Sequence, residues 1–408
     1  MMYQIRLYDE VPAPKEVTVK KDRIVAAHYY PAWKKGAAEL HGGFEEIYDY
    51  PERTPLMGYY DEEDPQVTDW EIKWCLEHGI NCWIYCWYRR KYNVGHPITT
   101  EDLRCAHGIH EGLFHAKYGN RMKFALMFEA QGLWGASDSK DMLENLMPFW
   151  LENYFCRENY LKIDNKPVLF VYDYGHQLKE GFGSIEEQKR VFDLCREMAK
   201  EHGFDGMIFA EEYRKADFSV YNELRNRGFD FSFTYNNRVK EALPSDEVVI
   251  KEQLRQIDER NEKVPGYTVP TASCMWDPSP RLAKNELIQA TPEKLVQIWK
   301  LSPESYRILL REIVARMDAL PENDYGNRIL MIDNWNEWDE GHYVSPSYEF
   351  GFGFLQAIRE ELTERDNLPD YRLPQTLGFS CNKNWEEPDL SRYNEIGKSH
   401  LKENQKKN

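Results

Sequence analysis

Eight short apolar runs alternate with amphipathic helical patterns along this chain of 408 residues. The runs are apolar on successive residues and too short for helices, which is typical of parallel strands covered on both faces. Alternation of strands and helices predicts an α/β fold with helices outside a parallel sheet. Eight repeats within about 340 residues favour one closed (β/α)8 TIM barrel over an open doubly wound sheet. The expected strands are 24–30, 80–88, 122–130, 167–174, 206–212, 229–235, 267–276 and 328–335.

The segments between these runs predict the outer helices and the limits of the barrel. A dinucleotide-binding sheet is disfavoured because no glycine-rich turn follows the first run, and the chain contains no phosphate-binding loop. We expect residues 1–362 to form the barrel and residues 363–408 to form an irregular appendage packed on it. The expected helices are 66–78, 100–118, 138–155, 184–202, 216–227, 245–263, 353–362, and one long helix or two shorter ones within 291–319.

The net charge limits the kinds of binding partner that are expected, and the pattern of cysteines indicates the cellular compartment. Lys and Arg number 52 against 69 Asp and Glu, a net charge of −17 that disfavours nucleic acid and anionic membranes as partners. No stretch approaches the roughly 18 apolar residues that a membrane-spanning helix needs. The eight cysteines form no CxxC pair, and the first residues carry no basic head followed by an apolar run. We therefore expect a cytoplasmic protein with reduced thiols, unless an export signal has been trimmed from the chain.

The ends of the expected strands carry mostly acidic, amide and aromatic side chains. In a (β/α)8 barrel the active site lies at the carboxyl ends of the strands. Carboxylates there can act as acid, base or nucleophile, and aromatic rings can stack on the apolar faces of sugars. The chain has neither an HExxH zinc helix nor a GxSxG nucleophile turn, so those hydrolase classes are disfavoured. No metal and no cofactor are expected.

The segment that ends the eighth run, residues 334–341 with the sequence NWNEWDEG, is the most informative in the chain. It places two glutamates, Glu337 and Glu340, three residues apart in a turn. Glycoside hydrolysis needs two carboxyl groups about 5–5.5 Å apart for retention of configuration, or about 6.5–9.5 Å apart for inversion. A pair at this spacing can meet that requirement, so we expect Glu337 and Glu340 to be catalytic.

The other strand ends supply candidate substrate-binding residues. Glu211 and Glu212 point to opposite faces if both lie in a strand, so only one can face the barrel axis, and Glu211 is the one we favour. The acidic run 61–64 precedes a helix, where negative charge suits the N-terminus, and we interpret it as structural and not as a metal site. The substrate-binding candidates are His28, Tyr29, Tyr30, Trp87, Arg89, Glu129, Tyr174, Glu211, Tyr235, Asn236, Trp276, Asn334, Trp335, Asn336 and Trp338.

With these residues in view, the chain resembles the WbsX-like proteins, regarded as glycosyltransferases of polysaccharide biosynthesis, and the related glycoside hydrolase family 99 endo-α-mannosidases and mannanases. Three segments carry the resemblance: HYYPAW at 28–33, GYYD at 58–61 continuing through 64–65 to 79–80, and NWNEWDEG at 334–341. The resemblance implies a (β/α)8 barrel that acts on glycans. It also implies that Glu337 is the base at the sugar's 2-hydroxyl, giving an anhydro intermediate, and that Glu340 is the acid and then the base at the leaving oxygen.

These features together predict a retaining glycoside hydrolase, independent of metal, with an α-linked oligosaccharide or polysaccharide as substrate. Two alternatives stay open: a glycosyltransferase of surface-polysaccharide biosynthesis, as the WbsX name implies, and a non-catalytic carbohydrate-binding barrel. The transferase is disfavoured because no phosphate loop and no Asp-x-Asp motif ends a strand, and the binding barrel because both glutamates are present. The chain departs from the WbsX pattern at 128–131, FEAQ, and at 87–90, WYRR, so the sugar and the linkage stay open.

Overall fold

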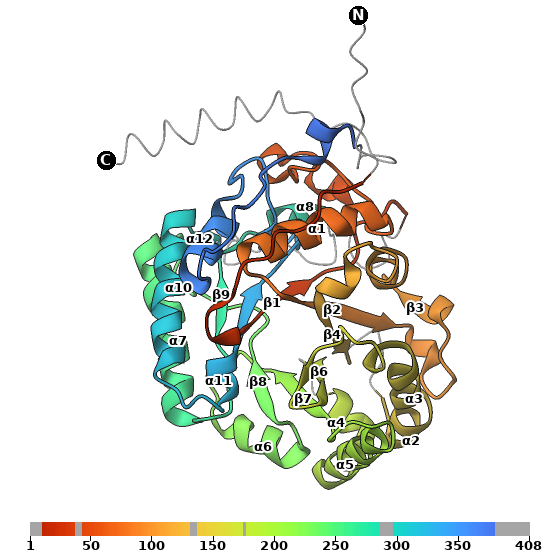
Figure 1. Ribbon diagram of the computed structural model, residues 1–408. Coiled ribbons are helices and arrows are strands. Elements are labelled where there is room, and N and C mark those ends of the chain that lie inside the picture. The colour runs from red at the N-terminus through yellow and green to blue at the C-terminus, as the bar shows by residue number, and fades with distance from the viewer. Residues whose placement is uncertain (1–9, 37–42, 131–136, 174–176, 285–296, 380–408) are drawn as a thin grey trace, which may run out of the picture.

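Eight parallel strands form the wall of a nearly closed barrel, with helices around it, in the computed structural model of the protein (Figure 1). The structure describes residues 10–36, 43–130, 137–173, 177–284 and 297–379. The barrel strands are β1 (Ile24–Tyr29), β2 (Cys82–Arg89), β4 (Lys123–Glu129), β6 (Lys166–Tyr172), β7 (Ile208–Glu212), β8 (Phe231–Phe233), β9 (Thr271–Ser273) and β12 (Ile329–Asp333).

The order of the strands confirms the predicted (β/α)8 barrel. Hydrogen-bonded neighbours follow the order β8, β7, β6, β4, β2, β1, β12 and β9, and every pair along this path is parallel. A parallel bridge between Ser232 and Thr268 links the two ends of that order. The chain therefore returns to its first strands, and the carboxyl ends of all eight strands meet on one side of the barrel.

Successive residues of each strand point to opposite sides of the barrel wall. On the outer side, Tyr85 of β2 packs against Tyr29 of β1 with ring centroids 4.5 Å apart, and the Tyr29 hydroxyl donates to Glu71 at 2.7 Å. Glu71 belongs to α1 (Pro65–His78), so these rings lie between the wall and the helix layer. On the inner side, the ring of His28 packs against that of Tyr235 at 4.7 Å.

Local signals set the limits of α1. The carboxylate of Asp64 accepts a hydrogen bond from the backbone N–H of Gln66 at 3.0 Å, and Pro65 occupies the first helical position. At the other end, Gly79 has a φ of 93°, and a Cβ there would lie 2.5 Å from the Thr363 side chain. Glycine therefore both ends the helix and allows the later segment to pass, and Asp64 has the structural role expected of the acidic run.

The remaining helices surround the barrel. Serine side chains cap three of them: Ser184, Ser245 and Ser302 each accept a hydrogen bond from a backbone N–H of the first helical turn. The long helices are α5 (Ile185–Glu201), α6 (Ser219–Arg227), α7 (Asp246–Lys263), α10 (Pro303–Asp318) and α12 (Gly353–Leu362), and the short ones are α2 (Ser139–Asp141), α3 (Met147–Trp150), α4 (Gln177–Phe182), α8 (Ser279–Lys284) and α11 (Tyr325–Arg328).

Two expected helices differ in the structure. Residues 100–118 do not form one helix: Leu103–Arg104 instead form β3, which pairs antiparallel with the end of β2, and a π-helix spans Gly108–Leu113. Among the described residues of 291–319, the helix begins at Pro303, because Ser302 caps it and Trp299–Lys300 form β11, paired with β10 (Met275–Trp276). Residues 291–296 lie outside the described part of the chain. In both places pairing with a strand end overrides helical periodicity.

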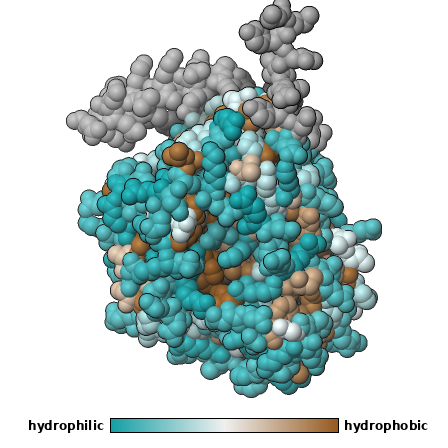
Figure 2. Space-filling view, viewed as in Figure 1, coloured by the Kyte–Doolittle hydropathy of each residue, from teal (hydrophilic) through white to brown (hydrophobic). Residues whose placement is uncertain are grey.

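The segments before β1 and after α12 lie together against α1. Val19 and Thr363 form an antiparallel bridge, and the Asn367 side chain donates to the carbonyls of Lys15 and Glu77 at 2.7 and 2.9 Å. The part of residues 363–408 that the structure describes, up to residue 379, thus packs on the barrel's helix layer. In the view of Figure 2, hydrophilic side chains cover most of the surface, and apolar side chains gather mainly near its middle. Among the described helices, none is long and apolar enough to cross a membrane.

Candidate active site

The loop that follows β12 folds back tightly and presents both glutamates of the NWNEWDEG segment. Glu337 and His342 form an antiparallel bridge across this turn, and Gly341 within it has a φ of 63°. A Cβ at Gly341 would lie 2.3 Å from the Asp277 carbonyl oxygen and 2.6 Å from the Arg53 guanidinium. Only glycine fits this position, so the turn that brings Glu337 and Glu340 together depends on it.

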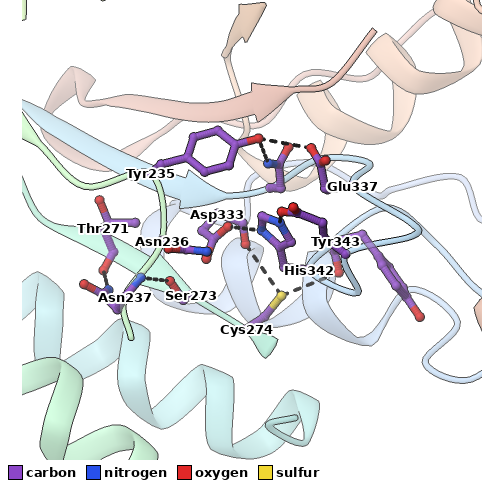
Figure 3. Close-up of polar contacts among 12 residues, drawn as sticks. Tyr235, Asn236, Asn237, Thr271, Ser273, Cys274, Asp333, Glu337, His342 and Tyr343 are labelled. Carbon is purple, nitrogen blue, oxygen red and sulfur yellow. Dashed lines mark hydrogen bonds and ion pairs between the residues drawn. The ribbon is translucent and has the colours of Figure 1, made fainter. Parts of the chain in front are cut away.

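Glu337 is buried and has two side-chain partners. The Tyr235 hydroxyl donates to its carboxylate at 3.0 Å, and the Asn334 amide donates in turn to the Tyr235 oxygen at 2.6 Å (Figure 3). The Arg281 guanidinium donates to the other carboxylate oxygen at 2.9 Å. Burial raises the pKa of Glu337, while the charges of Arg281 and His342 oppose that rise. Tyr235 and Arg281 are thus the hydrogen-bond partners that favour the ionised form of this carboxylate.

Glu340 ends a chain of three ionisable side chains. Nε2 of His342 lies 2.9 Å from a carboxylate oxygen of Glu340, and Nδ1 of His342 is hydrogen-bonded to Asp333 at the end of β12 (Figure 3). His342 and Asp333 are fully buried, whereas the Glu340 side chain keeps 19% of its surface exposed. The arrangement fixes the imidazole between a buried carboxylate and one that can meet a ligand.

Arg281 binds the acidic turn as a whole. Its guanidinium, on α8, pairs with Glu337, with Asp339 at 3.0 Å and with Glu340. Sequence reasoning missed Arg281 because nothing in its local sequence separates it from an ordinary helical arginine. It also missed His342, although that residue stands directly after the 334–341 segment and so carried a positional signal.

Three predicted residues approach this centre from neighbouring strands. The ring of His28 packs against Phe233 and Tyr235, and burial, followed by the charges of His342 and Arg214, lowers its pKa to about 3, so the imidazole is neutral. Burial and the nearby charges of Glu337 and Asp339 raise the pKa of Tyr30. Burial and the charges of Glu337 and Glu129 all raise the pKa of Tyr235. His28, Tyr30 and Glu129 therefore lie on the inner side of the barrel wall, within electrostatic reach of this centre.

On β2 the predicted residues point away from this centre. The Trp87 indole donates to the Tyr154 hydroxyl at 3.0 Å on the outer side of the wall. Arg89 forms a buried double hydrogen bond with Asp141 at 3.1 and 2.5 Å. The inward residues of β2 have the opposite parity: Cys86 and Tyr88 both interact electrostatically with Glu129. The prediction that Trp87 and Arg89 face the site is therefore wrong. The residues of β2 that face inward are their neighbours Cys86 and Tyr88.

The same parity error affects other strands. Tyr29 lies on the outer side against Glu71, and Trp335 donates its indole N–H to the same carboxylate at 2.9 Å. Glu211 is buried with Arg227 and Asp173 as its nearest charges, whereas Glu212 pairs with Arg214 on the inner side, near Tyr172. Glu212 is therefore the inward member of the pair, and Tyr29, Trp335 and Glu211 point toward the helix layer.

Two residues of the 334–341 segment hold its shape. Asn336 donates to the Tyr30 carbonyl and to the buried Glu62 carboxylate, at 3.1 and 2.8 Å, and accepts from the Tyr30 N–H at 2.8 Å. The Trp338 indole donates to the Tyr60 hydroxyl at 3.0 Å. These side chains are fully buried, so they position the glutamates rather than face a ligand. Tyr174 lies outside the described residues.

A pocket of about 230 Å³ opens beside Glu340 and contains two of the predicted residues, Asn236 and Trp276. The Trp276 ring lies 5.2 Å from that of His342. Arg281 and Trp299 line the same pocket. A space with aromatic walls next to a partly exposed carboxylate is suited to a sugar ring.

The carboxylates also define the place where a cation could bind. Glu337, Glu340 and His342 each offer a ligand atom, and these atoms lie within 4.8 Å of one another. The Arg281 guanidinium already donates to both glutamates at this place. A metal ion would have to displace that fixed positive charge, so the donor set fits an arginine-bound carboxylate pair better than a metal centre.

Comparison with known sequences identifies relatives over most of the chain. The family described as Glycosyltransferase WbsX matches residues 43–358. Two curated proteins from strains of Xanthomonas campestris pv. campestris, both named Uncharacterized protein WxcX, are 24% identical over 356 residues. Those alignments cover 82% of this chain and 48% of each relative, so the chain spans about half the length of the curated relatives it matches.

Comparison with solved structures supports the barrel. Two structures of the GH99 endo-α-mannosidase from Bacteroides thetaiotaomicron give TM-scores of 0.55 and 0.53 at 13% identity, covering 83% of this chain and 94% and 96% of those chains. A structure described as a glycoside hydrolase-like protein gives a TM-score of 0.56 at 14% identity, covering 86% of this chain and 98% of that one. At these identities the likeness establishes the fold alone. The match over residues 43–358, in contrast, covers well over half of the sequence, and the chain belongs to the WbsX family of carbohydrate-active proteins.

Proposed function

We propose that this protein is a retaining glycoside hydrolase that acts on an α-linked glycan, with Glu337 and Glu340 as its catalytic residues. The observation that carries the proposal is the pair itself: two carboxylates in one turn at the carboxyl end of β12, each with a different set of partners. Two carboxyl groups held in different environments are the usual requirement for acid and base roles in one site.

Glu337 is the proposed base. It takes the proton of the sugar's 2-hydroxyl as that oxygen attacks the anomeric carbon and the bond to the leaving oxygen breaks, which yields a 1,2-anhydro sugar. A base must be ionised, and burial alone works against this because it raises the pKa of Glu337. The donor groups of Tyr235 and Arg281 favour the charged form and so support the role.

Glu340 is the proposed acid and then base. It gives its proton to the leaving oxygen, and afterwards takes a proton from the water that opens the anhydro ring at the anomeric carbon while Glu337 returns the other proton. Two displacements at the same carbon give net retention. The contact with Arg281 favours the charged form of Glu340, so the acid role requires that a bound glycan separate the two groups, while His342 keeps the carboxylate in place.

A glycosyltransferase is the second candidate, and the description of the family favours it. Its chemistry would use the same carboxylates with a sugar acceptor in place of water. The two functions differ in their donor: a transferase needs an activated sugar, whereas a hydrolase consumes the glycan alone.

The proposal is tested by incubating the protein with a panel of α-linked glycans and following products by mass spectrometry and proton NMR. We expect cleavage with a product of retained anomeric configuration. Glu337→Gln and Glu340→Gln should each lower turnover by at least about 10²-fold, since acid–base groups contribute about 10²–10⁴-fold. Glu201→Gln, an exposed residue of α5, is the matched control. An inverted product, or full activity in Glu337→Gln, would exclude this mechanism.

A further inference from the structure

A second pocket adjoins the one beside Glu340, and it is strongly basic. It also measures about 230 Å³, and cations outnumber anions in its lining six to two. The anions are Glu252 and Glu259; the cations are Arg214, Lys215, Arg238, Lys240, Arg255 and Arg260. In a chain with a net charge of −17, such a concentration of positive charge departs from the average composition of the surface.

The two pockets are neighbours. Arg238 lines both of them. Arg214, which lines the basic pocket, donates to the Asn236 side chain at 2.5 Å, and Asn236 lines the pocket beside Glu340. The loop between them is fixed: the Asn237 side chain donates to the Thr271 carbonyl at 2.7 Å, and its backbone N–H donates to Ser273 at 2.9 Å (Figure 3). The basic pocket therefore lies next to the pocket beside Glu340, at the place where the next unit of a longer ligand would lie.

Part of this positive charge is not held in a close ion pair by the described residues, although Lys240 has an electrostatic effect on Glu252. Arg255 is neutralised by Glu252 and Glu259, and Arg214 by Glu212. Arg238 and Lys240, in contrast, form no ion pair within the part of the chain that the structure describes. A guanidinium binds a carboxylate or a phosphate through two parallel hydrogen bonds, which makes Arg238 suited to an anionic ligand.

We propose that the glycan carries an acidic substituent, a carboxylate or a phosphate, and that Arg238 and Lys240 bind it on the leaving-group side of the site. This inference rests on the proposed function, because Glu340 marks the leaving-group side only if it is the acid that protonates the leaving oxygen. The aromatic pocket formed by Trp276 and Trp299 holds the sugar ring, and the basic pocket binds the substituent of that sugar or of the next one.

The test measures binding by titration calorimetry in the Glu337→Gln background, so that turnover does not interfere. Two pairs of probes separate the possible sources of the charge: an α-linked trigalacturonate against its carboxyl-reduced form, and mannose 6-phosphate against mannose. We expect the anionic member of at least one pair to bind about tenfold more tightly than its neutral partner, and this preference to shrink as salt is raised. The pair that shows the preference identifies the substituent.

The variant Arg238→Gln/Lys240→Gln should abolish that preference while leaving the affinity for the neutral probe unchanged. Lys251→Gln, on the exposed face of α7, is the matched control and should leave the preference intact. Equal binding of both members in both pairs, or a preference that survives the double variant, would overturn the inference. Failure of the hydrolase proposal has a separate signature: acidic probes bind as expected, but the unsubstituted protein cleaves no glycan of either charge.

Discussion

The Tyr235 hydroxyl connects the barrel wall to the proposed base. It accepts from Asn334 and donates to Glu337, and the Tyr235 ring packs on His28, whose imidazole is neutral. Asn334 therefore orients a hydroxyl whose only proton is directed at the carboxylate. A donor aimed at the ionised form of an acid lowers its pKa, so Tyr235 opposes the effect of burial on Glu337.

Tyr235→Phe keeps the ring and removes this donor. A hydrogen bond to a charged group contributes about 1.5–3 kcal/mol, which corresponds to about one to two pKa units, and part of it is replaced by Arg281. The pKa of Glu337 should rise, and activity, which needs the ionised base, should begin to fall at a pH about one unit higher on the acidic side. The profile of kcat/KM against pH measures this shift. Tyr213→Phe, at the end of β7 and away from the site, should leave the acidic limb unchanged; a Tyr235→Phe profile that matches it would contradict the role.

The Asp333–His342–Glu340 chain makes a different prediction, because its hydrogen bonds lead to the acid and not to the base. His342→Gln removes the bond to Asp333 while keeping a group that can donate near Glu340. Turnover of a natural glycan should fall about tenfold or more, a fraction of the 10²–10⁴-fold contribution of general acid catalysis. An aryl glycoside with a good leaving group needs no proton, so its turnover should be spared.

The comparison of the two substrates separates positioning from a general structural role. A loss of folding or of substrate binding in His342→Gln would lower turnover of both substrates equally, and that result would contradict the prediction. Glu337→Gln provides the reference, since loss of the base should affect both substrates.

At the scale of elements, the strand pattern predicted the barrel but could not predict which side each residue faces. The run that forms β2 is apolar or aromatic on both faces, because one face packs in the barrel and the other packs against helices. Such a strand lacks the polar–apolar alternation that marks an inner face. From the sequence, Trp87 and Cys86 are equally plausible as inward-facing residues, and so are Glu211 and Glu212. Only the packing of the helix layer decides which member of each pair faces the barrel interior.

The candidate site was predictable where a single segment of the sequence carries both of the proposed catalytic residues. The 334–341 turn holds both glutamates, and its glycine is required by close contact with Asp277 and Arg53. Arg281 was not predictable, because its function depends on how α8 is placed against that turn, which is a property of the tertiary structure. His28 and Tyr235 were predictable since both stand at strand ends.

A substitution at Arg89 tests whether this residue of β2 faces the helix layer, as the structure shows, rather than the site. Its double hydrogen bond with Asp141 joins the end of β2 to α2, and both side chains are fully buried. Burial would raise the pKa of Asp141, but Arg89 outweighs it and lowers that pKa. Because the folded pKa is lowered, the pair stabilises the protein above the unfolded pKa of about 4, and this stabilisation is lost as pH falls through the folded value.

Arg89→Ala should destabilise the protein by about 3–5 kcal/mol near neutral pH, since it leaves a buried carboxylate without its partner. Denaturant unfolding measures this, and the kcat of the folded protein should be little changed. A double-mutant cycle with Asp141→Asn should show strong coupling between the two positions. If Arg89→Ala unfolds like the parent protein but loses substrate binding, the residue faces the site after all.

At the scale of the whole molecule, the chain after the barrel packs on α1, the helix whose Glu71 accepts hydrogen bonds from Tyr29 and Trp335. Lys73 and Glu77 of α1 form a fully buried ion pair, and the Asp370 backbone N–H donates to Glu77 at 2.8 Å while its carbonyl accepts from Lys73 at 3.0 Å. Leu377 is buried, and the Phe379 ring packs on Trp70 at 5.9 Å. We propose that residues after 362 act as a structural appendage of one barrel domain rather than as part of its chemistry.

A chain that ends at residue 362 therefore exposes one side of α1 to water. Water can solvate Lys73 and Glu77, so the main loss is the apolar contact made by Leu377 and Phe379 and the bonds made by Asn367 and Asp370. Burial of one large apolar side chain contributes about 1.5–3 kcal/mol, so a loss of several kcal/mol and a fall in Tm of several degrees are expected.

Differential scanning calorimetry measures the change, and kcat at a temperature where both forms are folded should be unaltered, because Glu71 on the opposite side of α1 still holds Tyr29 and Trp335. A chain that ends at residue 379 keeps the contacts described here and is the control; equal Tm values for the two truncated chains would show that the segment 363–379 contributes nothing to the stability of the barrel.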